Sequence, residues 1–109
     1  SDPLKKAEFN LLAADKRLNS GIFLFNSAKQ NEKKINLALS TVSKGENYLE
    51  KTISNIETAK SQGADTSSLL EKMYRSVKKQ QEVLKVQKGL ESLLERLQGF
   101  EEKVIKLRE

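Results

Sequence analysis

The sequence of 109 residues contains no cysteine, no histidine and no tryptophan. Without cysteine and histidine it has no disulfide, no thiolate nucleophile, no histidine general base and no cysteine–histidine metal site. The absence of cysteine does not identify a compartment, because secreted and cytosolic proteins without cysteine look alike in this respect. We therefore expect a protein that is not an enzyme and that holds no cofactor and no metal.

Proline and aromatic residues are scarce as well. There is one proline, with four phenylalanines and two tyrosines, a composition that favours helices over strands. Hydrophobic residues make up 37% of the chain, enough to bury one elongated core but not to enclose a deep pocket. We expect a single all-α domain over residues 1–109.

Apolar residues recur every three or four positions, which is typical of helices that bury one face. The spacing slips between Leu84 and Leu90, next to Gly89, and such a slip indicates a kink or a break. We therefore expect an elongated antiparallel bundle of three long helices, the third kinked or broken near Gly89 to give a fourth segment. The helical segments are predicted at residues 3–29, 32–62, 66–86 and 89–108.

Residues that favour helix ends support these boundaries. Asp2, followed by proline, is a favourable helix start. Asn31 and Gly63 tolerate the left-handed conformation that ends a helix. The third helix starts at Asp65, or at Ser68 with a glutamate three positions later.

Two glycines lie inside the first two predicted helices. If these helices form an antiparallel pair joined by a short turn, Gly21 and Gly45 lie at nearly the same height. A glycine inside a helix costs about 1 kcal/mol relative to alanine. Either the two glycines allow the backbones to approach closely, or each is simply tolerated on its own.

The net charge of +5 is unevenly distributed along the chain. Residues 72–88 contain six basic residues and one acidic residue, and the segments on either side are close to balance. Lys72, Arg75 and Lys79 share one helix face, which predicts a site for a phosphate backbone or an anionic lipid. Tyr74 is the aromatic residue nearby and no nucleic-acid-binding motif is present, which argues against nucleic acid. A solvated outer face is the simpler interpretation.

Four consecutive apolar residues, 22–25, make one turn of the first helix apolar on all sides. Phe23 and Leu24 in this turn are candidates for contact with another protein or for self-association. Burial under the last helix is the simpler explanation. Tyr48 is expected at the edge of the core, with its hydroxyl group at the rim.

Carboxylates provide the remaining candidate chemistry. Glu46 and Glu50 lie one turn apart, and Asp15 on the first helix could lie near them in an acid–base or metal site. The lysines beside the two glutamates are instead typical of a solvated helix face. We favour surface charge and predict no catalytic residue here.

Five segments have the order and spacing of a known family: residues 2–8, 14–18, 39–51, 69–72 and 82–84. By these segments the chain resembles a bacterial family of uncharacterised helical domains, domain of unknown function 5667. The resemblance implies an extracytoplasmic location behind a membrane-spanning or signal segment, and no established activity. The chain departs from the family pattern at Gln80, where the family often has histidine after lysine, and in its short link before the last helix.

The chain begins with serine rather than methionine, so we expect a fragment, and an upstream targeting segment could have been removed from it. It contains no apolar run of the roughly 18 residues that a membrane span requires. The leading hypothesis is a non-enzymatic, extracytoplasmic helical module that acts as a scaffold or a protein-interaction domain. The alternative is a module that binds anionic surfaces through Lys72, Arg75 and Lys79 on the third predicted helix.

Overall fold

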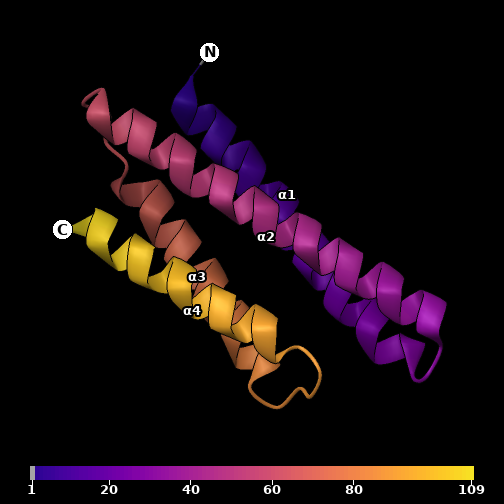
Figure 1. The fold of residues 1–109 in the computed structure, drawn as a ribbon. Helices are drawn as coiled ribbons and strands as arrows, with labels where there is room; N and C mark the ends of the chain where they lie inside the picture. Colours follow the sequence, from indigo (N-terminus) through magenta and orange to yellow (C-terminus); the bar gives the residue numbers. More distant parts are fainter. Residues whose placement is uncertain (1) are drawn as a thin grey trace.

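The computed structural model describes residues 2–109, and all regular structure within them is helical. The chain runs through α1 (Pro3–Ala28), α2 (Glu32–Ser61), α3 (Ser67–Leu84) and α4 (Glu91–Arg108). Figure 1 shows two helical hairpins, α1 with α2 and α3 with α4, packed along their length. The Cα positions extend over 49 × 26 × 16 Å, so the expectation of an elongated helical bundle is confirmed.

The sequence left open whether the third helix is kinked or broken near Gly89, and the structure has the break. The third helical segment is fully broken: α3 and α4 have 18 residues each and are joined by a loop over residues 85–90. Gly89 has a positive φ of 98°, and its N–H donates to the Glu91 carboxylate at 3.0 Å. This turn reverses the chain, so that α4 runs antiparallel to α3 and both Leu84 and Leu90 are buried.

Small residues recur at every seventh position on the contact faces of α1 and α2, and larger apolar residues recur between them. A seven-residue repeat of this kind is typical of helices that coil around each other in a left-handed sense. Because every seventh residue is small, the two backbones lie close together over more of their length than those of any other pair of helices in the described chain. The small residues, all buried, are Ala7, Ala14, Gly21 and Ala28 on α1, and Ala38, Gly45, Thr52 and Ala59 on α2.

The glycines Gly21 and Gly45 are points of close approach between the two helices. A Cβ atom on Gly21 would lie 2.6 Å from Cγ2 of Val42, and one on Gly45 would lie 2.8 Å from Cγ of Leu18. Close backbone approach is therefore the correct alternative of the two considered. The glycines do not face each other: Gly21 lies beside Val42, and Gly45 lies beside Leu18, about one turn away.

The turn between α1 and α2 differs from its prediction. The left-handed residue is Lys29, with φ of 53°, and Asn31 instead begins α2 by accepting a hydrogen bond from the Lys34 N–H at 3.1 Å. Asp2 begins α1 as expected, accepting from the Leu4 N–H at 2.9 Å. Asparagine occurs both at the start and at the end of helices, and Asn31 lies at the start of α2.

The connection from α2 to α3 follows its prediction closely. Gly63 has φ of 83°, and the Ala64 N–H donates to the Ala59 carbonyl at 3.0 Å, a pattern that ends a helix on a left-handed residue. Asp65 accepts from the Ser67 N–H at 3.0 Å and so satisfies a free donor at the start of α3. The chain then crosses so that α3 lies beside α1.

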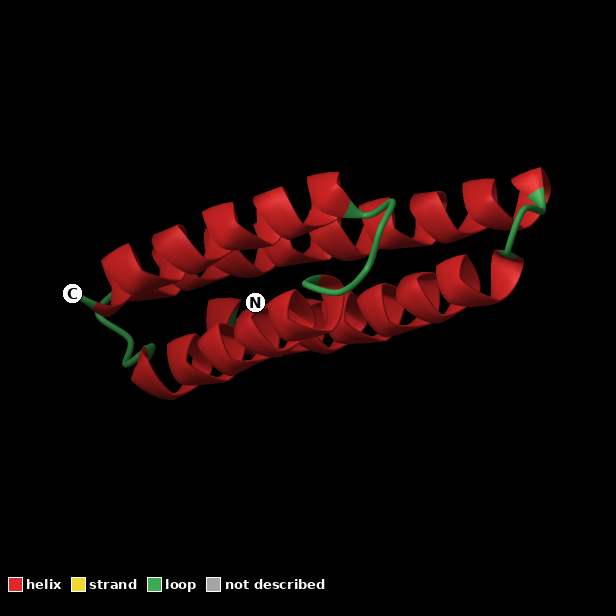
Figure 2. Ribbon diagram, turned by 90° about the horizontal axis from the view of Figure 1, so that it is seen from below, coloured by secondary structure: helices red, strands yellow, loops and turns green. Residues whose placement is uncertain are grey.

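Each helix of the second hairpin runs parallel to the helix that it contacts in the first. Two side-chain hydrogen bonds show this for α1 and α3. Gln80 of α3 donates to Asn19, and Gln87, in the loop after α3, donates to Asn26, so both partners advance in the same direction along the chain. In the same way α4 lies beside α2, where Arg96 contacts Glu46. The shorter hairpin covers only part of the longer one, so the α1–α2 turn projects beyond the α3–α4 loop (Figures 1 and 2).

Candidate binding surfaces

A groove of about 290 Å³ separates α1 from the first half of α3. Its apolar lining comes from Leu11, Leu12 and Leu69. Leu12 is 65% exposed, whereas the other two leucines are buried, so Leu12 forms an accessible wall of the groove. Charged side chains line the rest of it: Glu8, Asp15, Lys72 and Arg75.

The basic residues predicted to bind an anion lie on this side of α3, next to carboxylates. Lys72 and Arg75 line the groove, and Lys79 is near enough to Asp15 to stabilise its charged form. Arg75 also lies 3.8 Å from a Glu71 carboxylate oxygen. These carboxylates weaken the attraction of the three cations for an external anion, and the anion-binding hypothesis stays a prediction.

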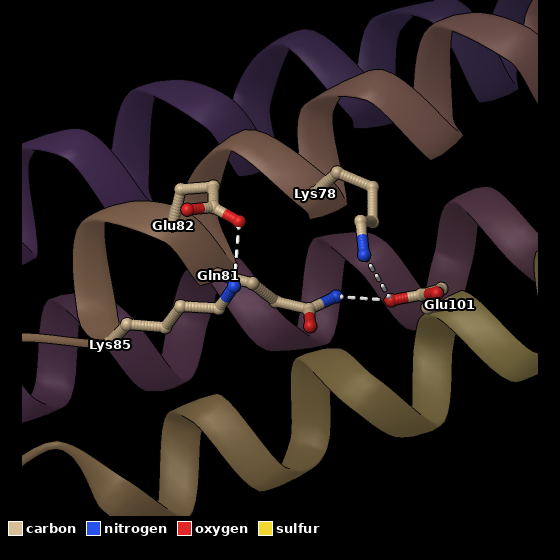
Figure 3. A network of polar contacts seen from close by, with 5 residues as sticks. All are labelled: Lys78, Gln81, Glu82, Lys85 and Glu101. Carbon is tan, nitrogen blue, oxygen red and sulfur yellow. Dashed lines mark hydrogen bonds and ion pairs between the residues drawn. The ribbon is translucent and has the colours of Figure 1, made fainter.

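Two other lysines of the basic segment, Lys78 and Lys85, are also paired with acidic residues. Lys78 Nζ lies 3.4 Å from Glu101 Oε1, to which Gln81 donates at 2.7 Å, so that one carboxylate joins α3 to α4 (Figure 3). Lys85, the first residue after α3, lies 2.8 Å from Glu82 in the last turn of α3. The excess charge counted along residues 72–88 is therefore partly neutralised in space.

Asp15 connects the two hairpins. Its carboxylate accepts a hydrogen bond from the Ser76 hydroxyl group on α3. Burial raises the pKa of Asp15 above its ordinary value, and the Ser76 hydrogen bond and the charge of Lys79 oppose the rise. Asp15 therefore lies at the α1–α3 contact, separate from the two glutamates of α2.

Glu46 and Glu50 are held by one arginine from α4. Arg96 lies 3.2 Å from Glu46 Oε2 and 2.8 Å from Glu50 Oε1. The prediction of a solvated pair is wrong for Glu46, whose side chain is 13% exposed, and burial raises the pKa of its carboxyl group against the opposing effect of Arg96. Within residues 2–109 no cluster of three potential ligands is placed to hold a metal ion.

Phe23 is 69% exposed and Leu24 is half-buried, so the prediction of burial under the last helix is wrong for Phe23. The reason is length: α4 begins at the α3–α4 loop and does not reach this part of α1. Phe9, 62% exposed, and Leu12 lie farther back on the same side of α1. We call Phe9, Leu12 and Phe23 the apolar edge of α1, a feature that the search for a buried stripe missed.

Tyr48 lies where it was expected, partly buried against the core, with Lys51 Nζ 5.2 Å from the centre of its ring. It belongs to a shallow depression across both long helices, lined also by Arg17, Lys44 and Asn47. This depression lies on the side of the α1–α2 hairpin that is turned away from α3 and α4. We call this side, with its two edges, the outer face.

The outer face carries eight exposed basic residues. The acidic residues of the two long helices lie elsewhere. Glu8 and Asp15 point toward α3, and Glu46 and Glu50 point toward α4. The other two glutamates of α2, Glu32 and Glu57, lie on the same side of the helix as Glu50. Charge counts along the chain missed this surface because the two signs alternate in sequence and separate only around the helices. The basic residues are Lys5, Lys6, Lys16, Arg17, Lys33, Lys34, Lys44 and Lys51.

Comparison of the chain with protein-family models, with curated proteins and with solved structures finds no match. The resemblance to domain of unknown function 5667 accordingly stays a prediction. No helix in the described part of the chain is long and apolar enough to cross a membrane.

Proposed function

We propose that the protein is a non-enzymatic helical module that acts as a scaffold or a protein-interaction domain. One observation carries this proposal: large apolar side chains of the apolar edge are exposed along α1 on a well-packed bundle. Exposed apolar residues that gather along one edge favour contact with a partner protein. The resemblance to domain of unknown function 5667 supports an extracytoplasmic location for the module.

The partner contact is centred on Phe9 and Leu12, where the apolar edge meets the groove between α1 and α3. A partner side chain in the groove would pack on leucines, and charged groups of both signs at the rim could pair with polar groups of the partner. A helix that presents apolar residues along one face matches a groove of this shape. Phe23 and Leu24 extend the same contact toward the α1–α2 turn.

A photo-crosslinking amino acid at Leu12, in the protein expressed in its native host, tests this proposal. We expect a discrete crosslinked product, which Phe9→Ser in the same chain reduces. The matched control is the same amino acid at Glu102, an exposed position on α4. A product of twice the mass of the chain would identify a second copy as the partner, and products that are absent or equal at both positions would contradict the proposal.

The alternative function is the binding of an anionic surface through Lys72, Arg75 and Lys79. The exposure of these residues on one side of α3 supports it, and the nearby carboxylates weigh against it. Replacement of the three residues by glutamate would abolish salt-sensitive binding if this function holds.

A further inference from the structure

The basic residues of the outer face stand in regular lines. Lys33, Lys44 and Lys51 are separated by 11 and 7 residues, about three turns and two turns, so they project in nearly the same direction from α2. Lys6 and Arg17 are also separated by 11 residues and form a second line on α1. The line on α2 is about 27 Å long, at 1.5 Å per residue, and the two lines flank the depression around Tyr48.

The positive charge of this surface is not compensated locally. Among residues 2–109, none of the eight basic residues belongs to an ion pair, whereas the basic side chains that do pair lie in the second hairpin. Because the net charge of the chain is +5, the remainder of the molecule carries a net negative charge. The outer face therefore attracts a polyanion, and the opposite side of the molecule does not.

Apolar side chains emerge from the same face near the α1–α2 turn. Leu37 is 55% exposed, Leu24 is half-buried, and Phe23 lies at the adjoining edge. This end of the hairpin projects beyond the α3–α4 loop, so a broad, flat surface can approach it without meeting the second hairpin (Figure 1).

The combination favours a lipid surface over a nucleic acid. The aromatic ring between the basic lines, that of Tyr48, is partly buried against the core, and Phe23 lies at the edge of the face, so the described part of this face has no row of exposed rings on which successive bases could stack. Leu24, Leu37 and Phe23 can instead enter the boundary between lipid headgroups and acyl chains. The surrounding lysines can keep their ammonium groups among anionic headgroups while their methylene stems lie along apolar material. A rigid surface with basic residues around exposed leucines therefore suits the surface of a bilayer.

We propose that the outer face of the α1–α2 hairpin docks on the surface of an anionic phospholipid bilayer. This inference goes beyond the proposed protein contact, and the two surfaces share only Phe23 and Leu24 near the tip of the hairpin. The basic residues provide the attraction, and Leu24, Leu37 and Phe23 enter the headgroup region at the tip of the hairpin. The apolar edge around Leu12 stays accessible to a protein partner.

Sedimentation with vesicles tests this inference. Vesicles of phosphatidylcholine with about one third phosphatidylserine should bind the protein, and vesicles of phosphatidylcholine alone should not, since each basic residue near an anionic surface adds about 1 kcal/mol. The outer-face variant replaces Lys6, Arg17, Lys44 and Lys51 by glutamate. The matched control replaces Lys72, Arg75, Lys79 and Lys88 by glutamate, so both variants have the same net charge and change only exposed residues.

We expect the outer-face variant to lose at least about a hundredfold in affinity for anionic vesicles, and the control to lose less than about tenfold. Equal losses in the two variants, or no binding of the unchanged protein, would overturn the proposal. Circular dichroism of both variants establishes that the helices are intact.

The apolar contribution and the nature of the anion need a second measurement. Leu37→Ser should weaken vesicle binding by about tenfold without affecting the fold, because the side chain is exposed. A duplex DNA of random sequence provides the comparison. Binding to DNA as tight as to vesicles, together with no effect of Leu37→Ser on vesicle binding, would reject the lipid in favour of a nucleic acid.

Discussion

Both hairpins are pairs of antiparallel helices, but they differ in the size of the residues that they bury. In the α1–α2 hairpin a small residue at every seventh position brings two long backbones close together. In the α3–α4 hairpin the buried residues are larger, among them Met73, Leu97 and Phe100, and Glu101 joins its two helices through polar bonds. The first hairpin is therefore sensitive to added volume, and the second to lost volume.

The two hairpins also differ in the residues that they expose to solvent. The α1–α2 hairpin buries its small residues inward and presents basic and apolar residues outward on the outer face. The α3–α4 hairpin covers the opposite side and pairs about half of its charged residues. We infer that the long hairpin forms the binding surfaces and the short hairpin holds it rigid.

The largest expected difference between the hairpins comes from added volume. Ala14→Leu inserts three extra carbon atoms at the closest helix contact and should lower the free energy of unfolding by about 3 kcal/mol. Val77→Leu, at the buried contact of α3, adds one carbon atom and should cost about 1 kcal/mol. Urea denaturation followed by circular dichroism measures both values, and equal losses would show that the two contacts are equally accommodating.

Glycine-to-alanine substitutions should have opposite signs in the two hairpins. Gly21→Ala forces a Cβ atom against Val42 and should cost about 2 kcal/mol, despite the better helix propensity of alanine. A Cβ atom on Gly99 of α4 would meet no atom within 4 Å, so Gly99→Ala should raise the free energy of unfolding by about 1 kcal/mol. Thermal unfolding of the two variants checks the prediction, which fails if both changes have the same sign.

The turns of the hairpins offer a similar contrast. Lys29 adopts a positive φ that is unfavourable for a side chain, so Lys29→Gly should stabilise the protein by about 1 kcal/mol. Gly89→Ala should destabilise it, because φ is 98° and the new Cβ atom would lie 2.6 Å from the Phe25 ring. Differential scanning calorimetry distinguishes a rise in Tm for the first variant from a fall for the second. No change at Lys29 would show that its conformation relaxes without cost.

The smallest predicted effect is on the pH dependence of stability, through Asp15 at the contact between the hairpins. Burial raises the pKa of Asp15, so the folded state binds a proton more readily than the unfolded chain. The contribution of this group to stability therefore increases as the pH falls through its raised folded-state pKa toward the unfolded pKa of about 4. Asp15→Asn should remove that increase, as measured by urea denaturation at a series of pH values.

Asp65 provides a control, because its effect on the pH dependence of stability has the opposite sign. Its pKa is lowered by hydrogen bonds from Ser67, so its contribution is present above the unfolded pKa of about 4 and is lost as the pH falls further. Asp65→Asn should reduce the loss of stability in acid, while Asp15→Asn should not. The same pH dependence in both variants would contradict the assignment of these effects.

The sequence predicted the helices well because their signals are local. The start of α1 at Asp2 and the end of α2 at Gly63 depend on hydrogen bonds within a few residues, and each predicted boundary lies within two residues of the observed one. The slip in spacing beside Gly89 indicated an interruption but could not distinguish a kink from a reversal. That distinction depends on the conformation of one glycine and on the packing of α4.

The candidate surfaces were harder to predict because they depend on residues far apart in the sequence. The pairing of Glu46 with Arg96 joins residues 50 positions apart, and no local pattern around Glu46 indicates it. Likewise, residues 1–71 are nearly neutral in total, which concealed the separation of basic from acidic side chains around α1 and α2. A charge count around each predicted helix, rather than along the chain, would have found the outer face.

The central claim is that the outer face, and not the second hairpin, meets an anionic bilayer. Because the chain has no cysteine, one cysteine can be placed at Ser20 on the outer face or at Ser92 on α4, both exposed, and labelled with a polarity-sensitive fluorophore. We predict that vesicles containing phosphatidylserine shift the emission of the probe at Ser20 to shorter wavelength and leave the probe at Ser92 unchanged. A shift at Ser92 alone, or equal shifts at both positions, would contradict the claim.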